Sequence, residues 1–395
     1  MLCPSCWPTK RKNHGFLYLD HYLRKFSGGL DWIIDGLTGF GKSKRYDWWP
    51  DLLVALSRIK IIRFHPEVDE TQLFNRTLIF IKEAKRRGIR IEGISLLGRY
   101  SNEFRFAHAG RWHHFEGIPL LVLGSCGALD DKNLVKQTLK KNGVPIAEGR
   151  AFSDPRKAFA FGQALGFPLV TKPNAGSLSH HVTCNIRTED DLRRGIAIAK
   201  QYQPVFIVER YVPGSLFRAS VIGQTHVFVC QKDPANVVGD WTSTIEELIN
   251  RKNADPKRGE THQKNTTLHR IPVDDMLTER LAHQNLSLAS VLPNGQKVYL
   301  QEKFILSQGC DIVALTNETH PDNMELFKSI AALFDTHLVG IDFICQDIRQ
   351  SWKNQPCAVL ETNSLPYVDM HQEPSHGEPD PVAEIVWDVV LKNVE

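Results

Sequence analysis

Two lysines in this sequence stand where they could hold a polyphosphate between them. Lys132 follows Asp131 at the start of a predicted helix, and Lys172 stands before Pro173 at the end of a predicted strand. A small-residue loop that includes Gly176 and Ser177 comes next. Two ammonium groups on different elements can grip phosphates by charge while backbone N–H groups of such a loop close over them. The alternative for either lysine alone is a solvated surface charge.

Three oxygen-bearing side chains near the end of the chain could bind magnesium. Asp342 lies in the predicted strand GIDFI, and Glu361 and Asn363 lie in VLETN. Residues two apart on a strand point to the same face, so Glu361 and Asn363 share one. Two carboxylates and an amide oxygen suit Mg²⁺ ions that bridge phosphates. Ordinary polar residues of an edge strand are the alternative.

The stretch FIVERYVPGSLFR could receive the base of a nucleotide. A buried apolar strand runs there into Glu209, and a linker then leads to Arg218. An adenine can lie against such a strand and accept hydrogen bonds from the linker backbone. The stretches around Lys132, Lys172, Glu209 and the Asp342–Glu361 pair therefore together predict a site for a nucleoside triphosphate and its metal.

A second candidate for phosphate binding is the pattern G-x-x-x-x-G-K-S at residues 36–43. A P-loop needs a helix that begins at its lysine and adds the N-terminal dipole to the phosphate site. Pro50 follows Lys42 too closely for more than about two helical turns. No strand that ends in an aspartate offers an obvious magnesium ligand for this loop. We therefore interpret the pattern as a chance match, and a P-loop NTPase remains the alternative.

Composition narrows the class of protein. The 395 residues are 42% hydrophobic and 24% charged, which is ordinary for a globular protein of two or three domains. A net charge of +3 gives no reason to expect a nucleic-acid partner, and the basic residues between Lys82 and Arg90 fit a solvated helix surface. No apolar run reaches the roughly 18 residues of a membrane span, and the start lacks a signal-peptide core. We therefore expect a cytoplasmic protein without a membrane partner.

The cysteines give no disulfide pattern. Eight scattered cysteines in a chain of this size are expected to be reduced thiols. Cys3 and Cys6 form one CxxC, but no second one follows, and His14 and His21 do not complete zinc-finger spacing. A frayed terminus is favoured over a structural zinc site.

The elements before residue 124 indicate an α/β domain. Phe74, Leu78 and Ile81 recur at helical spacing, and Gly88 then precedes the alternating run IRIEGI. From residue 117 we expect a short buried strand, a turn, and a helix over 132–141 that Asn142 and Gly143 close. The turn at 124–127 is the predicted boundary between an N-terminal domain, 1–124, and a second domain, 125–395.

Strands dominate the second domain. A strand, a loop and a second strand are predicted for GFPLVTKPNAGSLSHHVTCN, and a further strand for PVFIVERYVPG. Two more strands are predicted for VGIDFICQDI and CAVLETNSLP. The polar segment 240–296 lies between strands and is interpreted as a helical lid or insertion. DPVAEIVWDVVLKNV predicts a closing amphipathic helix.

Taken in order, these stretches resemble the ATP-grasp superfamily over residues 125–395. The runs NVVGDWTSTIEELINRKNADPKRGETHQKNTTLHRI, HPDN, HLVGIDFICQDI and CAVLETNSLPYVDMHQEPSHGEP are similar to the ATP-grasp domain of cyanophycin synthetases and bifunctional glutathione synthetases. The resemblance implies an α/β ATP-grasp fold with a lid insertion, and a carboxylate–amine ligase. Such an enzyme uses ATP and two Mg²⁺ ions to form an amide through an acylphosphate, here on amino acid or peptide substrates.

The resemblance also implies roles for particular residues. Lys132 and Lys172 would hold the phosphates, and Arg218 would stand beside the transferred phosphoryl group. The adenine strand and linker would be Val208 and Glu209 to Val212, including Tyr211. Lys232 takes the place of a usual arginine and keeps its charge without the bidentate fork. Asp342, Glu361 and Asn363 would bind the metal ions. Residues expected to contribute to the lid or the substrate site are His262, Lys264, Gln301 and His371, the last with a packed or solvent-facing histidine as the alternative.

Several positions depart from the family pattern. Ser179 and His181 stand at later glycine positions of the loop, and Leu216 stands where an acidic residue usually binds ribose. Gln301 and Ile305 replace a usual arginine and asparagine, which suggests a different acid and amine. Because both lysines, Arg218 and the metal ligands are retained, an active ligase is favoured over a non-catalytic ATP-grasp binding or scaffold protein. The N-terminal domain would help select the substrate, and a homo-oligomer is possible.

Overall fold

The chain folds into helices and largely antiparallel sheets. The computed structural model describes residues 14, 15, 18, 22, 49–124, 129, 131–174 and 180–394. The chain divides into two compact units, Met1–Arg63 with Asp130–Val212 and Phe64–Leu129 with Pro213–Glu395. This division differs from the boundary predicted at 124–127, which stays a prediction. Among the described residues, no helix has the length and apolar character to cross a membrane.

The first unit is built on a four-stranded sheet in the order β5-β8-β6-β7, antiparallel throughout. Its elements are α2 (Trp49–Arg58), α4 (Lys132–Lys141), β5 (Gly149–Phe152), α5 (Pro155–Leu165), β6 (Leu169–Pro173), β7 (Thr183–Ile186), α6 (Glu189–Tyr202) and β8 (Phe206–Arg210). Side chains of α5 and α6 form one core with Leu169, Phe206 and Val208. Because side chains alternate along a strand, Lys172 and Glu209 lie on the opposite face of this sheet.

Helix α4 confirms the prediction for residues 132–141. The Asp131 side chain accepts hydrogen bonds from the backbone N–H groups of Asn133 at 2.9 Å and Leu134 at 3.1 Å, which caps the first turn. Gly143, with φ of 72°, takes the left-handed conformation that ends a helix. The cap therefore fixes Lys132 as the first residue of the helix.

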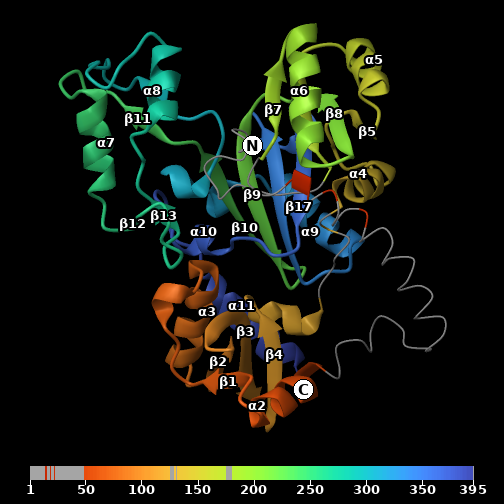
Figure 1. Ribbon diagram of the computed structural model, residues 1–395, viewed down its shortest axis with the longest axis vertical. Helices are drawn as coiled ribbons and strands as arrows, with labels where there is room; N and C mark the ends of the chain where they lie inside the picture. Colours follow the sequence, from red (N-terminus) through yellow and green to blue (C-terminus); the bar gives the residue numbers. More distant parts are fainter. Residues whose placement is uncertain are drawn as a thin grey trace. The chain divides into compact units, whose positions relative to one another are not determined.

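The second unit contains a five-stranded antiparallel sheet in the order β15-β10-β9-β16-β17. Its strands are β9 (Ser215–Ile222), β10 (His226–Asp233), β15 (Asp311–Ala314), β16 (Leu338–Cys345) and β17 (Cys357–Asn363). Helix α9 (Pro321–Leu333) covers one face, where Phe327 packs edge-on against Phe343 with ring centroids 5.3 Å apart. The other face carries Arg218 and Asp342, and the sheet is shown in green and blue in Figure 1.

The predicted insertion forms a small subdomain with its own core of residues between 235 and 300. It contains β11 (Asn236–Val238), α7 (Ile245–Asn253), β12 (Arg258–Gly259), β13 (Leu268–His269), α8 (Asp275–Ala282) and β14 (Lys297–Tyr299), drawn in teal and green in Figure 1. Arg258 and Lys252 both form ion pairs with the buried Asp311 at the start of β15. The segment is therefore helical in part, as predicted, and is joined to the sheet by buried charges.

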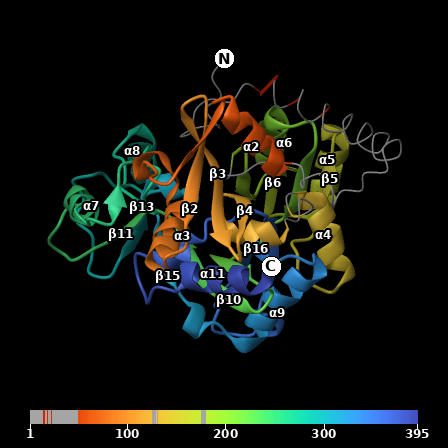
Figure 2. The ribbon, with the colours of Figure 1, turned by 90° about the horizontal axis from the view of Figure 1, so that it is seen from below.

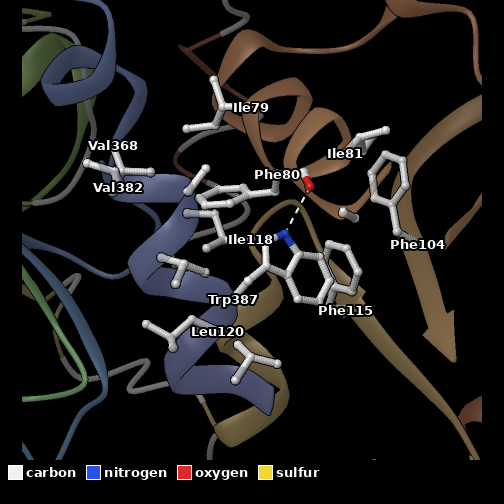
Figure 3. Packing of buried hydrophobic residues seen from close by; sticks show 14 of the residues in the cluster. Ile79, Phe80, Ile81, Phe104, Phe115, Ile118, Leu120, Val368, Val382 and Trp387 are labelled. Atoms are coloured by element: carbon white, nitrogen blue, oxygen red, sulfur yellow. Dashed lines mark hydrogen bonds between the residues drawn. The ribbon is translucent and has the colours of Figure 1, made fainter. Parts of the chain in front are cut away.

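A second sheet of four strands, β1-β2-β3-β4, contains β1 (Ile62–His65), β2 (Ile91–Leu96), β3 (Arg99–His108) and β4 (Arg111–Glu116). Helix α3 (Asn75–Arg86) precedes β2, as the spacing of Phe74, Leu78 and Ile81 predicted. The C-terminal helix α11 (Val382–Asn393) lies against α3 (Figure 2), and Trp387 Nε1 donates to the Phe80 carbonyl at 2.9 Å (Figure 3). Residues 73–120 and the C-terminal helix thus share one core.

The strand predicted after residue 117 is wrong. Pro119–Leu123 form a 3-10 helix, η4, with Pro119 in its first turn. Proline has no N–H to donate to a strand partner and its fixed φ suits the start of a helix. The remaining short elements are η3 (Glu70–Gln72), η6 (Leu306–Gln308), η7 (Thr316–Glu318), η8 (Trp352–Asn354) and α10 (Asp369–Gln372).

Candidate active site

In the first unit, Lys172 and Glu209 form a buried ion pair. Lys172 on β6 pairs in register with Ile207 on β8, so Glu209 is its diagonal neighbour on the same face. Lys172 Nζ donates to Glu209 Oε1 at 2.7 Å, and the two side chains are 8% and 2% exposed. Burial disfavours the charged carboxylate, but the charges of Lys172 and Lys136 outweigh it and lower the pKa of Glu209.

Lys136 completes this cluster and was not predicted. It lies one turn after Lys132 on α4, forms an ion pair with Glu209 Oε2, and donates to the Ala147 carbonyl at 3.2 Å. Burial lowers the pKa of its ammonium group. The available signal was its place beside Val135, on the helix face that enters the core. Because a lysine in a helix is normally solvent-exposed, the sequence did not indicate that Lys136 belongs to the site.

The predicted adenine strand, β8, is hydrogen-bonded to a strand on each side. Val208 is fully buried in the core, because β8 lies between β5 and β6. Tyr211 and Val212 follow the strand, and the Tyr211 N–H donates to the Pro168 carbonyl at 3.0 Å. The Val208 side chain therefore cannot contact a ligand in this arrangement. Its backbone and the half-buried linker remain the candidate adenine contacts.

The phosphate loop is described only in part. Gly176 and Ser177 lie outside the described residues, as do the P-loop pattern at 36–43 and Cys3 and Cys6. His181, at a later glycine position, has φ of 54°. Its Nδ1 lies 2.7 Å from the Ile198 carbonyl. The backbone thus keeps the left-handed conformation that glycine favours, although a side chain is present.

In the second unit, three charged side chains meet on one face of the sheet. Arg218 on β9 pairs in register with Asp342 on β16, and Arg218 Nε donates to Asp342 Oδ1 at 2.6 Å. Lys232 on β10 donates from Nζ to Asp342 Oδ2 at 2.9 Å. Burial opposes ionisation of Asp342, but the two cations outweigh it and hold the pKa of this carboxyl well below its usual range.

A glycine makes room for this arrangement. A Cβ atom at Gly340 would lie 3.0 Å from Arg218 Nη1 and 2.6 Å from Pro366 Cβ. Any larger residue would therefore displace the guanidinium or the chain at Pro366. The arrangement therefore requires a glycine at position 340, and the sequence analysis did not predict this requirement.

The predicted metal ligands lie on neighbouring strands. Glu361 on β17 pairs in register with Asp342, and Asn363 pairs with Gly340, so the three side chains share one face. The Asn363 side-chain nitrogen is buried and has no hydrogen-bond partner among the described residues. A 180° rotation of the amide would present its oxygen there.

These residues fit magnesium in its usual protein setting, in which one or two carboxylates are supplemented by substrate phosphates and water. The described residues contain no group of three or more His, Cys, Asp or Glu placed to hold a metal by themselves. A metal at this face would therefore depend on Asp342, Glu361 and Asn363 together with ligands from a bound nucleotide.

The predicted substrate residues Gln301 and His371 occupy different settings. Phe304, three residues after Gln301, packs its ring 5.0 Å from Lys232 Nζ, so this segment borders the charged cluster. The Gln301 side-chain oxygen is buried without a hydrogen-bond partner among the described residues. His371 is fully buried, and its Nε2 lies 2.8 Å from Ser220 Oγ on β9. The packed histidine, which the sequence left open, is the alternative that this burial favours.

His262 and Lys264 line a cavity of about 770 Å³. The lining residues, all polar or aromatic, are Thr71, Gln72, Tyr100, His262, Gln263, Lys264 and Asn265. The Lys264 carbonyl accepts from the Asn75 N–H at 2.9 Å, and its ammonium group lies 5.4 Å from the centre of the Phe74 ring. The insertion loop thus meets the N-terminal part of the same unit at a polar cavity.

Each unit thus assembles part of the predicted site. Lys172 and Glu209 come together in the first unit, and Arg218, Lys232, Asp342 and Glu361 come together in the second. Lys132 lies at the start of α4. The approach of Lys172 to the metal ligands, which a shared triphosphate requires, stays a prediction.

Comparison with known proteins identifies ligases as relatives. Cyanophycin synthetase of Trichormus variabilis is 33% identical over 325 residues, which are 80% of this chain and 35% of that protein. The glutathione biosynthesis bifunctional protein GshAB of Listeria innocua is 29% identical over 325 residues, which are 80% of this chain and 41% of that protein. A bifunctional glutathione synthetase from Pasteurella multocida has a similar structure, with a TM-score of 0.64, 23% identity, and coverage of 82% of this chain and 44% of that one.

No protein-family model matches the chain. The relatives nevertheless confirm the resemblance derived from the motifs. The similar structure confirms the expected fold class, an α/β ATP-grasp fold. The N-terminal domain and the role of the insertion as a lid stay predictions. The chain spans less than half the length of these relatives, so it corresponds to one part of each.

Proposed function

We propose that this protein is an ATP-dependent carboxylate–amine ligase. The observation that carries the proposal is the buried cluster of Arg218, Lys232 and Asp342, with Glu361 in register beside it. Such a cluster combines cations for a transferred phosphoryl group with oxygen ligands for the metal that accompanies ATP. Homology to cyanophycin synthetase and GshAB supports the same reaction class.

The reaction proceeds in two displacements. A carboxylate oxygen of the acid attacks the γ-phosphorus of ATP, the bond to the β-phosphate oxygen breaks, and ADP leaves. The amine then attacks the acyl carbon, the bond to the phosphate oxygen breaks, and a proton leaves the nitrogen. The products are an amide, ADP and phosphate. Little covalent work falls to the protein, so charge neutralisation and alignment account for most of the rate.

Named residues serve these steps. Lys132 and Lys172 hold the phosphates, and the loop with Gly176 and Ser177 covers them. Arg218 and Lys232 stabilise the charge that builds on the transferred group. The base lies along the backbone of Val208 and the linker from Glu209 through Tyr211 to Val212.

Magnesium completes the site. Ligases of this fold generally use ATP and Mg²⁺, which supports both assignments. Asp342, Glu361 and Asn363 would hold two ions, which would offset the negative charge of the phosphates of ATP. Both oxygens of Asp342 already accept from Arg218 and Lys232, so this carboxylate positions the cations and the metal together.

The substrates are small molecules or peptides. The polar cavity beside His262 and Lys264 and the segment at Gln301 are the places we assign to substrate binding or closure. His371 is buried with its Nε2 2.8 Å from Ser220 Oγ, so we assign it a positioning role in the sheet in place of substrate binding.

A non-catalytic nucleotide-binding protein is the second candidate. The specific observation in its favour is His181, whose side chain occupies a left-handed position where glycine would allow closer backbone approach. The presence of Lys132, Lys172, Arg218 and the three candidate metal ligands weighs against it.

The test is a screen for ATP-dependent mass gain in amino acid and peptide mixtures, with ADP and phosphate measured in parallel. We expect a product whose amount equals the ADP and phosphate released. Glu361→Gln should abolish turnover and keep the fold, because it removes metal-binding charge at nearly constant volume. Folded protein that binds ATP but gives no product across the panel would favour the binding protein.

A further inference from the structure

The buried cluster in the first unit places two lysines, Lys136 and Lys172, on the single carboxylate of Glu209. Glu209 receives Lys172 on Oε1 and Lys136 on Oε2, and the three side chains are 10% exposed or less. Two lysines therefore share one carboxylate in a setting that water hardly reaches. Lys136 has no role in the nucleotide site described above.

The need for a second cation follows from the proposed function, on which this inference rests. Lys172 must turn its ammonium group toward phosphate, whereas here it donates to Glu209 at 2.7 Å. If Lys172 were the sole partner, its departure would leave an ionised carboxylate buried without compensation, which is strongly unfavourable. The ion pair would then hold Lys172 away from the nucleotide.

We propose that Lys136 is a positioning residue that keeps Glu209 neutralised and so releases Lys172 for the triphosphate. The geometry fits this role, because Lys136 occupies the carboxylate oxygen that Lys172 leaves free. Its additional bond to the Ala147 carbonyl ties the ammonium group to the backbone. Lys136 therefore stays with Glu209 when Lys172 moves.

The test measures how much the phosphates contribute to binding. Dissociation constants for Mg·ATP and for adenosine are determined by calorimetry. The dissociation constant for adenosine divided by that for Mg·ATP reports the phosphate contribution, and a lower ratio means a smaller contribution. In Lys136→Met, Lys172 becomes the only counter-ion of Glu209, and we expect this ratio to fall at least about tenfold while adenosine affinity changes less than about threefold. Lys140→Met, an exposed change on the same helix, is the matched control and should leave the ratio unchanged.

A second substitution separates positioning from direct phosphate binding. In Lys136→Met with Glu209→Gln, the carboxylate charge at position 209 no longer holds Lys172, so the ratio should return to within about threefold of the wild type. A ratio that stays low would mean that Lys136 binds phosphate itself and would overturn the inference. An unchanged ratio in Lys136→Met would overturn it as well.

Two further results keep the test decisive. Should Lys136→Met fail to fold, Glu209→Gln alone must bind with a ratio at or above that of the wild type, and a lower ratio refutes the role. Wild-type protein that binds neither ligand would overturn the nucleotide site and this inference with it. Binding by the wild type with no effect of Lys136→Met overturns only the role of Lys136.

Discussion

Replacing Asp342 with asparagine should destabilise the protein through the two cations that the carboxylate neutralises. The change keeps the side-chain volume but leaves Arg218 and Lys232, 7% and 10% exposed, without their counter-ion. Loss of one partner from a buried ion pair costs about 3–5 kcal/mol. Glu361 still faces Arg218 and contributes to raising its pKa, so we expect the lower end, about 3 kcal/mol.

The assay is urea unfolding followed by circular dichroism at pH 7. Burial raises the pKa of Asp342, but Arg218 and Lys232 outweigh it and lower the folded-state pKa below the unfolded value. Its contribution is therefore fully present at pH 7 and is lost only as pH falls below the unfolded value, about 4. Glu318→Gln, which breaks an exposed pair with Arg349, is the control and should cost less than about 1 kcal/mol.

Adding Lys232→Met to Asp342→Asn removes one of the stranded cations and should restore about 1–2 kcal/mol of the loss. If Asp342→Asn unfolds within about 1 kcal/mol of the wild type, as the exposed control does, the reasoning about this cluster is refuted. Failure of Lys232→Met to restore any stability would exclude Lys232 from it.

Four other substitutions test three separate parts of the account. Trp387→Ala should lower the free energy of unfolding by about 3–5 kcal/mol in urea, because it empties the core shared by α3 and α11; a loss below about 1 kcal/mol would contradict that packing. Burial and the charge of Arg218 lower the folded-state pKa of His371 to about 3, so the unfolded chain takes up the proton first and stability falls as pH drops below about 6.5. His371→Gln should therefore lose about 2 kcal/mol less than the wild type between pH 7 and pH 5, and equal losses would argue against a neutral buried imidazole. Lys172→Ala should weaken Mg·ATP binding at least about tenfold in calorimetry while Lys42→Ala leaves it unchanged, and the reverse result would favour the P-loop.

The sequence predicted the elements that carry strong local signals. Asp131 and Gly143 bound the helix at 132–141 because capping chemistry is local. The strands around Asp342 and Glu361 are confirmed, because alternation and apolar runs identify strands without knowledge of their neighbours. Pro119 shows the limit of the apolar signal, since LLVL suits a strand until the missing N–H of the proline is considered.

Features that depend on contacts between distant residues could not be predicted in the same way. Lys136 meets Glu209 across 73 positions, and Trp387 reaches Phe80 across 307. Gly340 has a role only because Arg218 folds over it from another strand. Each contact depends on the register of strands or the docking of helices, which a single sequence does not specify.

The most direct test of the proposed chemistry follows the oxygen of the acid. Once the screen identifies an acid and an amine, the acid is labelled with ¹⁸O in its carboxylate and the released phosphate is analysed by mass spectrometry. An acylphosphate requires that one labelled oxygen leaves with each phosphate, in step with the ADP and amide formed. Phosphate without the label would contradict carboxylate activation by ATP and, with it, the proposed ligase.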